Sequence, residues 1–284
     1  MLLVFAFYGG KMNYESSFIK NLEPCAGIFS LIKNFSGINL NEAHRRLVSS
    51  FVKQRLSILE INLADYERLL YSDDEEFYLL IDTAAINETY FFREEIQFDF
   101  LNHFYLPKFD SGQIRIWSAA CSSGEEAVSL YALCKSHSIS AKILASDIDT
   151  FVLKILKDEN YTEKSFKHDG QKYHHLIENC CRFDGKTYTL DDDAKKSIIP
   201  FCYNLVHGGK IPLSFGEFDI VFLRNLFIYF DEDLQRRILN NIAVSIKKGG
   251  LLFLSVNETA SVFCNGSIPY KKEHYGDVYF LRRI

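Results

Sequence analysis

The sequence predicts a doubly wound α/β fold, a mostly parallel sheet with helices on both faces, preceded by an all-helical N-terminal domain. After residue 113, short apolar runs alternate with helical patterns, which is the arrangement typical of a parallel sheet. Residues 14–82 instead carry apolar positions at helical spacing. The chain of 284 residues has room for two domains of ordinary size.

Composition and charge describe an ordinary globular chain and exclude several classes of protein. Hydrophobic residues make up 48% of the sequence and charged residues 24%. The net charge of −5 argues against general nucleic-acid binding, and no apolar run is long enough to insert into a membrane. The seven cysteines are odd in number and lack zinc-site spacing, so we expect reduced thiols, a cytoplasmic location and no metal.

The first residues are apolar but do not form a typical signal peptide. Lys11 follows the apolar run, whereas a signal peptide carries its positive charge before the run. Met12 opens a polar segment that is typical of an ordinary start, so residues 1–11 are interpreted as an upstream extension. The sequence leaves open whether Met1 or Met12 is the true start.

A long basic helix is expected over residues 41–59 of the N-terminal domain. Four basic residues and no acidic residue lie between positions 43 and 59. Arg46 and Lys53 are seven residues apart and therefore share one face of the helix. This face is either an ordinary solvated surface or a docking surface for an acidic helix.

The pattern divides the chain into three parts, at residues 12–82, 83–112 and 113–284. The middle part contains the polar and aromatic segment Asn87-Glu-Thr-Tyr-Phe-Phe-Arg93. A helix is expected after it over residues 94–103, ending before Pro107, because proline is unfavourable inside a helix.

The third part contains the strands and helices of the predicted sheet. Strands are expected at residues 114–117, 142–145, 219–223, 251–256 and near 278–281, and helices at 125–137, 150–157 and 231–247. Residues 159–199 interrupt this alternation. Asp184-Gly185 lies there between two short β-prone runs, which is a strong hairpin signal and predicts a small β insertion.

Two polar segments follow neighbouring strands and form a nucleoside-binding pattern. Small residues dominate the loop at 118–126, so its backbone N–H groups can approach a ligand, and Asp147 can accept hydrogen bonds from ribose hydroxyls. Gly124 is the single glycine of this loop, whereas dinucleotide sites need several glycines around a pyrophosphate. A nucleoside ligand without phosphate, such as S-adenosylmethionine, therefore fits better. The alternative is that Asp147 is a turn or helix-capping acid.

Other candidate residues lie near strand ends or at the start of a helix. Acids at positions 125 and 126 stabilise a helix dipole by about 0.3–1 kcal/mol without any ligand, although a ligand ammonium group would give one of them a second role. Arg224-Asn225 ends a strand, where ligands bind in open α/β sheets. Tyr229 follows four residues later, either as a packed aromatic or as a site residue. Asn204-Leu205 lies at another strand end or loop.

Taken together, these segments resemble the CheR family of chemotaxis receptor glutamate methyltransferases. The most specific segment is Asn87-Glu-Thr-Tyr-Phe-Phe-Arg-Glu94, and the resemblance extends over about residues 25 to 258. The other three segments are Trp117-Ser-Ala-Ala-Cys-Ser-Ser-Gly-Glu-Glu126, Ala145-Ser-Asp-Ile-Asp149 and Phe218-Asp-Ile-Val-Phe-Leu-Arg-Asn-Leu-Phe-Ile-Tyr-Phe230. The resemblance implies a Rossmann-like methyltransferase domain that carries the β insertion.

The resemblance also implies a cofactor, S-adenosylmethionine, with S-adenosylhomocysteine as the product. It assigns cofactor binding to Asn87, Thr89, Arg93, Glu126, Asp147, Asn204, Leu205, Arg224 and Asn225. Within this set, Glu126 would meet the methionine ammonium group, in preference to Glu125, and Asp147 would hold the ribose. Arg93 and Tyr229 are the implied catalytic residues, with Tyr229 close to the transferring methyl group.

The implied function is methylation of glutamate side chains on methyl-accepting chemotaxis receptors during chemotactic adaptation. The implied partner is the cytoplasmic helical region of such a receptor, and the expected form is a monomer. The β insertion has only Gly170 and Gly185 where the family often has a glycine-rich loop, so docking of a receptor tail peptide stays open. Two alternatives are a cofactor-binding sensor or scaffold of the same fold, and a methyltransferase acting on another substrate.

Overall fold

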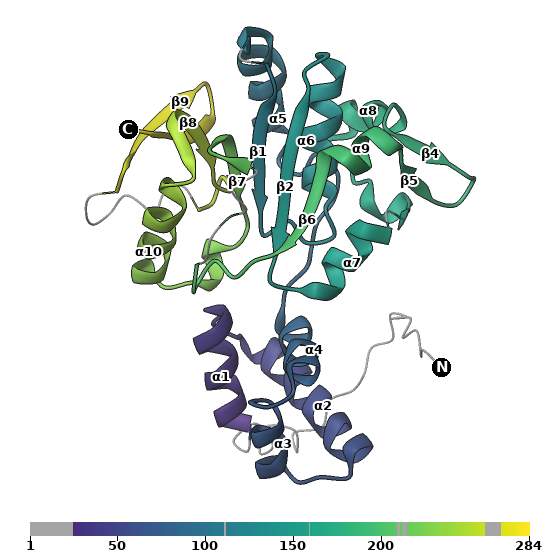
Figure 1. The fold of residues 1–284 in the computed structure, drawn as a ribbon, viewed down its shortest axis with the longest axis vertical. Helices are drawn as coiled ribbons and strands as arrows, with labels where there is room; N and C mark the ends of the chain where they lie inside the picture. The colour runs from purple at the N-terminus through teal and green to yellow at the C-terminus, as the bar shows by residue number, and fades with distance from the viewer. Residues whose placement is uncertain (1–24, 111, 159, 209–210, 212–214, 259–267) are drawn as a thin grey trace.

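The computed structural model describes residues 25–110, 112–158, 160–208, 211, 215–258 and 268–284. A small helical unit precedes a larger α/β unit, and the two are stacked along the long axis of the molecule (Figure 1). The predictions about a signal peptide, an upstream extension and the start at Met1 or Met12 concern residues that lie outside this description. The division of the chain at residues 82 and 112 stays a prediction.

The described part of the helical unit contains four helices, which confirms the predicted all-helical character but not a predicted number. They are α1 (Ala26–Ser36), α2 (Glu42–Leu59), α3 (Leu63–Leu69) and α4 (Asp74–Ala84). Side chains cap three of them: Asn41, Asn62 and Asp73 each accept a hydrogen bond from a backbone N–H in the first turn. The helix predicted over 41–59 is confirmed, with Asn41 as its cap.

The core of the helical unit contains a buried carboxylate, Glu76, that binds the basic side chain of Arg55. Glu76 is 4% exposed. It accepts two hydrogen bonds from the guanidinium of Arg55, at 2.8 and 2.6 Å, and one from the Tyr66 hydroxyl at 2.8 Å. Arg55 therefore stabilises the unit from within, and Arg46 pairs with Glu42 on the surface of the same helix.

The large sheet has seven strands in the order β6-β2-β1-β7-β8-β10-β9. These strands are β1 (Ile114–Ala119), β2 (Ala141–Asp147), β6 (Ile198–Cys202), β7 (Phe218–Leu223), β8 (Ile246–Phe253), β9 (Tyr270–Tyr275) and β10 (Val278–Arg283). The first five in the sheet order are parallel, and β10 and β9 complete one edge as antiparallel strands. The predicted doubly wound, mostly parallel sheet is confirmed.

Alternating residues along the strands pack against two different layers. On one face, Ile114 and Ile116 of β1 belong to a core shared with α5 (Glu95–Phe100) and α6 (Glu125–Ser136). On the other face, Trp117 of β1 belongs to a core shared with α10 (Glu232–Ala243). This second core continues into the helical unit, so the two units pack together.

The predicted β insertion is present, and it also contains helices. Its small sheet has the order β3-β5-β4, with strands at Asn160–Tyr161, Tyr188–Leu190 and Cys181–Phe183. The hairpin predicted across Asp184-Gly185 joins β4 to β5, which confirms it. Helices α8 (His174–Glu178) and α9 (Asp192–Ser197) accompany these strands. The end predicted at about residue 199 comes slightly too late, because the β-branched pair Ile198-Ile199 joins the large sheet as β6 beside β2.

Two predicted helix ends are also wrong. The helix expected to stop before Pro107 continues from α5 through a π-helical turn and a short 3-10 helix, Leu106–Lys108. Pro107 fits there because the first turn of a helix needs no N–H from it. The helix predicted over 231–247 ends at Ala243, and β8 begins at Ile246. Gly249 and Gly250 therefore lie inside β8 and not after a helix. Gly249 has a φ of +79° and lies where the pairing of β7 with β8 shifts register.

Two further expectations concern the thiols and the membrane. Cys25, Cys121, Cys134, Cys180, Cys181 and Cys202 are free thiols in the part of the chain that the structure describes, which agrees with the expected reduced state. Cys264 lies outside that part. Among the described helices, none is both long enough and apolar enough to cross a bilayer.

Candidate active site

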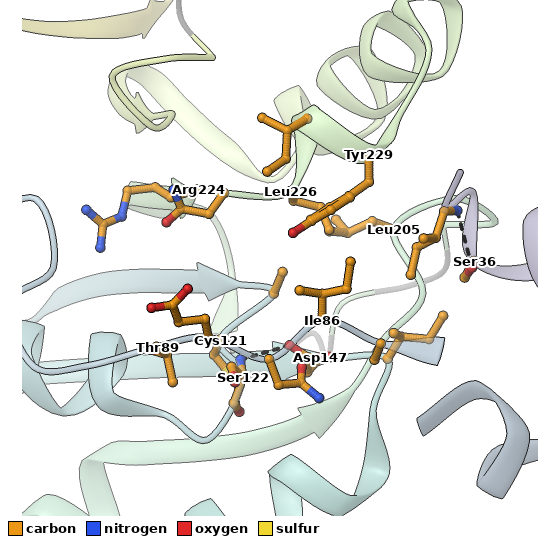
Figure 2. A pocket seen from close by; sticks show the side chains of 18 of the residues that line it. Ser36, Ile86, Thr89, Cys121, Ser122, Asp147, Leu205, Arg224, Leu226 and Tyr229 are labelled. Carbon is orange, nitrogen blue, oxygen red and sulfur yellow. Dashed lines mark hydrogen bonds between the residues drawn. The ribbon is translucent and has the colours of Figure 1, made fainter. Parts of the chain in front are cut away.

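A cleft opens at the carboxyl ends of the parallel strands, beside the junction with the helical unit (Figure 2). The strand order departs from β1 in two directions, to β2 and to β7, and ligands in open α/β sheets bind at such a switch point. All ten predicted site residues line the cleft: Asn87, Thr89, Arg93, Glu126, Asp147, Asn204, Leu205, Arg224, Asn225 and Tyr229.

Asp147 lies at the end of β2 with its carboxylate held by two backbone groups. The N–H of Ser122 donates to Oδ2 at 2.8 Å, and the N–H of Asp149 donates to Oδ1 at 3.0 Å. Burial raises the pKa of Asp147 to about 6, against the opposing effect of these two hydrogen bonds. The side chain is therefore mainly ionised at neutral pH and presents an acceptor at the cleft.

The loop after β1 exposes its backbone toward the cleft. Ala120, Ser122 and Gly124 all have positive φ angles, of 62°, 51° and 93°. A Cβ on Gly124 would lie 2.5 Å from the side chain of Leu156, so this position requires glycine. The Ser122 hydroxyl is buried and has no hydrogen-bond partner among the described residues, which indicates a polar ligand group beside it.

Glu126 and Arg224 form a buried ion pair at the floor of the cleft. Arg224, which is 5% exposed, donates from Nε to Glu126 Oε2 at 2.7 Å. Ser118 donates to the other oxygen of Glu126 at 2.6 Å. Glu125 instead accepts hydrogen bonds from two serine hydroxyls away from the cleft. The geometry therefore favours Glu126 over Glu125, which is also what the family resemblance of the sequence implies.

Arg224 also connects the sheet to the connector segment, residues 83–112 between the two units. Its Nη1 donates to the carbonyl of Arg93 at 2.7 Å and to Gln97 Oε1 at 3.2 Å. Arg93 itself donates to the carbonyl of Glu88 at 2.6 Å. Both Arg93 and Glu88 are among the residues that line the cleft.

Asn225 and Tyr229 belong to the loop that follows β7. Asn225 has a φ of 56° and donates from its side chain to Glu94 and to Ser255, at 3.1 and 3.0 Å. Tyr229 ends a short 3-10 helix, Phe227–Tyr229, and its hydroxyl points into the cleft on the side opposite Asp147 (Figure 2). Burial raises the pKa of Tyr229, so the hydroxyl is protonated at neutral pH.

Asn87 and Asn204 hold neighbouring segments in place around the cleft. The amide of Asn87 donates to Asp149, next to the tip of β2. The amide of Asn204 donates to the carbonyl of Phe35 in the helical unit at 2.8 Å, and its oxygen accepts the N–H of Val206 at 2.9 Å. The side-chain contacts of Asn204 thus connect the two units.

Sequence reasoning missed the contribution of the helical unit to this cleft. Ser36 and Ile38 line it, and the N–H of Asn39 donates to the carbonyl of Tyr229 at 3.1 Å. Gly37 lies between them at φ 75°, and a Cβ there would lie 2.6 Å from Leu234. In the sequence, Ser36-Gly37 indicates a helix break and residues 36–40 resemble the helical domain of the CheR family, but neither signal predicts a contact with the cleft.

These residues fit S-adenosylmethionine. Asp147 provides an acceptor for ribose hydroxyls, Glu126 provides a carboxylate for an ammonium group, and Ser122 provides an unpartnered buried hydroxyl. Together with the sheet order, these groups define the class: an S-adenosylmethionine-dependent methyltransferase.

Comparison with known proteins identifies the family. The family model "CheR methyltransferase, SAM binding domain" matches residues 87–268. The chemotaxis protein methyltransferase of Borreliella burgdorferi is 32% identical, over 82% of this chain and 86% of that protein. Chemotaxis protein methyltransferase 2 of Vibrio cholerae is also 32% identical, over 85% of this chain and 90% of that protein. The chain belongs to the CheR family of chemotaxis protein methyltransferases.

A more distant relative agrees with this assignment. The chemotaxis protein methyltransferase of Escherichia coli is 28% identical, over 84% of this chain and 92% of that protein. The similarity covers 86%, 90% and 92% of the length of these three relatives.

Proposed function

We propose that this protein transfers a methyl group from S-adenosylmethionine to glutamate side chains of methyl-accepting chemotaxis receptors. The products are glutamate methyl esters, formed in chemotactic adaptation, and S-adenosylhomocysteine. The observation that carries this proposal is that the segments resembling the CheR family meet at one cleft of the described structure. We further propose that the enzyme acts as a monomer in the cytoplasm, on the helical cytoplasmic region of the receptor.

The site residues receive the following roles in this proposal. Asp147 holds the ribose hydroxyls. Glu126 holds the methionine ammonium group, and the hydrogen bond from Arg224 fixes the orientation of the Glu126 carboxylate. The remaining cofactor-binding positions line the cleft around these two: Asn87, Thr89, Arg93, Asn204, Leu205, Arg224 and Asn225. Arg93 and Tyr229 face the reacting groups.

The mechanism needs no general base. A glutamate side chain has a reference pKa of about 4.3, so the receptor carboxylate is already ionised at neutral pH. When bound, the cofactor supplies an electrophilic methyl group on a positively charged sulfur. The protein has to align the carboxylate oxygen with that methyl group and exclude water, and such positioning can contribute about 7–11 kcal/mol.

Two side chains can hold the incoming carboxylate. Tyr229 carries a protonated hydroxyl directed into the cleft, so it can donate a hydrogen bond to a carboxylate oxygen. Arg93 donates one hydrogen bond to Glu88 and retains further N–H groups for a carboxylate or for the cofactor. Both residues therefore orient the acceptor or the methyl group rather than move a proton.

The proposal is tested by incubating the protein with methyl-labelled S-adenosylmethionine and membranes that contain chemotaxis receptors. We expect label in the receptor band that is released by mild base as a methyl ester. Cofactor binding without any label transfer would support the alternative of a sensor or scaffold. Label on another acceptor would support a methyltransferase with a different substrate.

Replacing Tyr229 with phenylalanine is expected to lower kcat by about tenfold or more, which corresponds to about 1.4 kcal/mol of transition-state stabilisation. The ring and its packing stay in place, so the dissociation constant of S-adenosylhomocysteine is expected to change much less. Steady-state methylation and calorimetry measure the two quantities. An equal loss in both would show that Tyr229 acts in cofactor binding and not in positioning.

Reversing the charges of Arg46 and Lys53 together is expected to raise KM for the receptor. Both lie on one face of α2, which we propose as the docking surface for an acidic receptor helix. Cofactor affinity is expected to stay unchanged, because neither residue lines the cleft. Arg68→Glu, an exposed reversal on α3 of the same unit, is the matched control. An unchanged receptor KM in the double variant would favour an ordinary solvated surface.

A further inference from the structure

Glu258 is a buried carboxylate that the mechanism above does not use. It is 2% exposed and lies after β8, beyond the residues that line the cleft. Its Oε2 accepts the backbone N–H groups of Asn225 and Ser255, each at 3.0 Å. Its Oε1 accepts the N–H of Phe227 at 2.7 Å and that of Ile228 at 3.4 Å. One side chain therefore holds four backbone groups from two separate loops.

Three of those four groups belong to the loop that carries the proposed catalytic tyrosine. The 3-10 helix Phe227–Tyr229 begins with N–H groups that have no partner within the helix, and Glu258 accepts two hydrogen bonds there. Asn225 has a left-handed backbone at φ 56°. Residues other than glycine adopt this conformation rarely, asparagine more often than most, and at Asn225 the hydrogen bond from its N–H to Glu258 helps to hold it.

The contacts made by Glu258 are suited to an ionised carboxylate. Burial raises its pKa, and the hydrogen bonds from Ser255, Asn225, Phe227 and Ile228 oppose that rise. Hydrogen bonds from N–H groups to a charged acceptor are stronger than those to a neutral one. An amide at this position would replace one acceptor oxygen with a donor, and two of the N–H groups would then face another donor.

We infer that Glu258 is a positioning residue for methyl transfer, because it fixes the loop between Asn225 and Tyr229 against the end of β8. This inference rests on the proposed function. Glu258 itself does not touch the reacting atoms. It acts through the backbone of Ile228, which precedes Tyr229 directly, and through the left-handed backbone of Asn225, which lines the cofactor cleft.

Strand β7, which leads into the loop held by Glu258, offers a matched control at its opposite end. Asp219, near the start of β7, is 7% exposed. It accepts the N–H of Arg115 at 2.9 Å and pairs with Lys247. Asp219 is thus a similarly buried carboxylate that holds backbone in the same sheet. It is far along the strand from the cleft and does not line it.

The experiment compares receptor methylation by Glu258→Gln, Glu258→Asp and Asp219→Asn with that of the wild-type protein. Each variant is assayed well below its own thermal midpoint, so that all are folded. For Glu258→Gln we expect kcat to fall by about tenfold or more with receptor KM changed by less than about threefold. Glu258→Asp keeps the charge on a shorter side chain and is expected to recover part of kcat. Asp219→Asn should lower the thermal midpoint and leave kcat unchanged.

The outcomes separate the inference from the function on which it rests. No methylation by the wild-type protein would overturn the proposed function and the inference with it. Methylation by the wild type with an unchanged kcat in Glu258→Gln would overturn the inference alone. An equal fall of kcat in Asp219→Asn would assign the effect to general stability and would also overturn it. If Glu258→Gln does not fold, Glu258→Asp decides, because an aspartate with wild-type kcat contradicts the positioning role.

Discussion

Replacing Asp147 with alanine is expected to weaken the binding of S-adenosylhomocysteine by about 100-fold or more, because two hydrogen bonds to a charged acceptor contribute about 1.5–3 kcal/mol each. The carboxylate also holds the N–H of Ser122, so its loss loosens the loop after β1 that lines the same cleft. Calorimetry with the wild-type protein and the variant measures the two dissociation constants directly.

A capping residue elsewhere in the α/β unit provides the control for this experiment. Asp231 caps α10 by accepting the N–H of Leu234 at 2.9 Å, and it does not line the cleft. Asp231→Ala is expected to lower stability by about 0.5–2 kcal/mol, as losing a helix cap does, without a change in cofactor affinity. If Asp147→Ala behaves in the same way, Asp147 is only a turn acid and its proposed ribose contact is wrong.

Replacing Arg224 with leucine is expected to lower the free energy of unfolding by about 3–5 kcal/mol, because the change leaves a buried carboxylate without its cation. Arg224 and Glu126 are 5% and 9% exposed, and their contact of 2.7 Å is supplemented by bonds from Arg224 to Arg93 and Gln97. Urea unfolding at neutral pH, followed by circular dichroism, measures the loss.

Two further variants test the cause of that loss. Arg282→Leu is the matched control, because Arg282 packs over an aromatic ring as Arg224 does. The ion pair that it removes, with Glu273, is more exposed than the pair of Arg224 with Glu126. A surface pair of this kind contributes about 0–1 kcal/mol. Adding Glu126→Gln to Arg224→Leu should recover part of the stability, since the unpaired charge is then absent. A double variant no more stable than Arg224→Leu would show that lost packing, and not the buried charge, is responsible.

Much of the fold follows from local pattern, because each element carries its own signal. The Asn41 cap fixes the start of α2, and Asp184-Gly185 fixes the small hairpin. The errors occur where tertiary contacts override that signal. Ile198-Ile199 looked like the end of a polar insertion until pairing with β2 made it a strand, and Ile246 joins β8 because β7 lies beside it.

The sequence predicts which residues belong to the site, but it does not predict the contacts between them. The predicted site residues all line the cleft. Those at strand ends do so because parallel strands bring their carboxyl ends to one edge of the sheet. The pairing of Arg224 with Glu126 joins positions that are 98 residues apart, and no spacing in the sequence predicts it. The same holds for Asn204 with Phe35 and for Glu258 with the loop at Asn225, where only the folded chain brings the groups together.

Mapping the modified residues on a receptor after reaction with S-adenosylmethionine tests the central claim most directly. The account predicts one added methyl group per modified site, on glutamate side chains of the cytoplasmic helical region, labile to mild base and absent when Asp147→Ala replaces the wild-type protein. A receptor that stays unmodified beside a folded, cofactor-binding enzyme would contradict the account, as would a methyl group found on another kind of side chain.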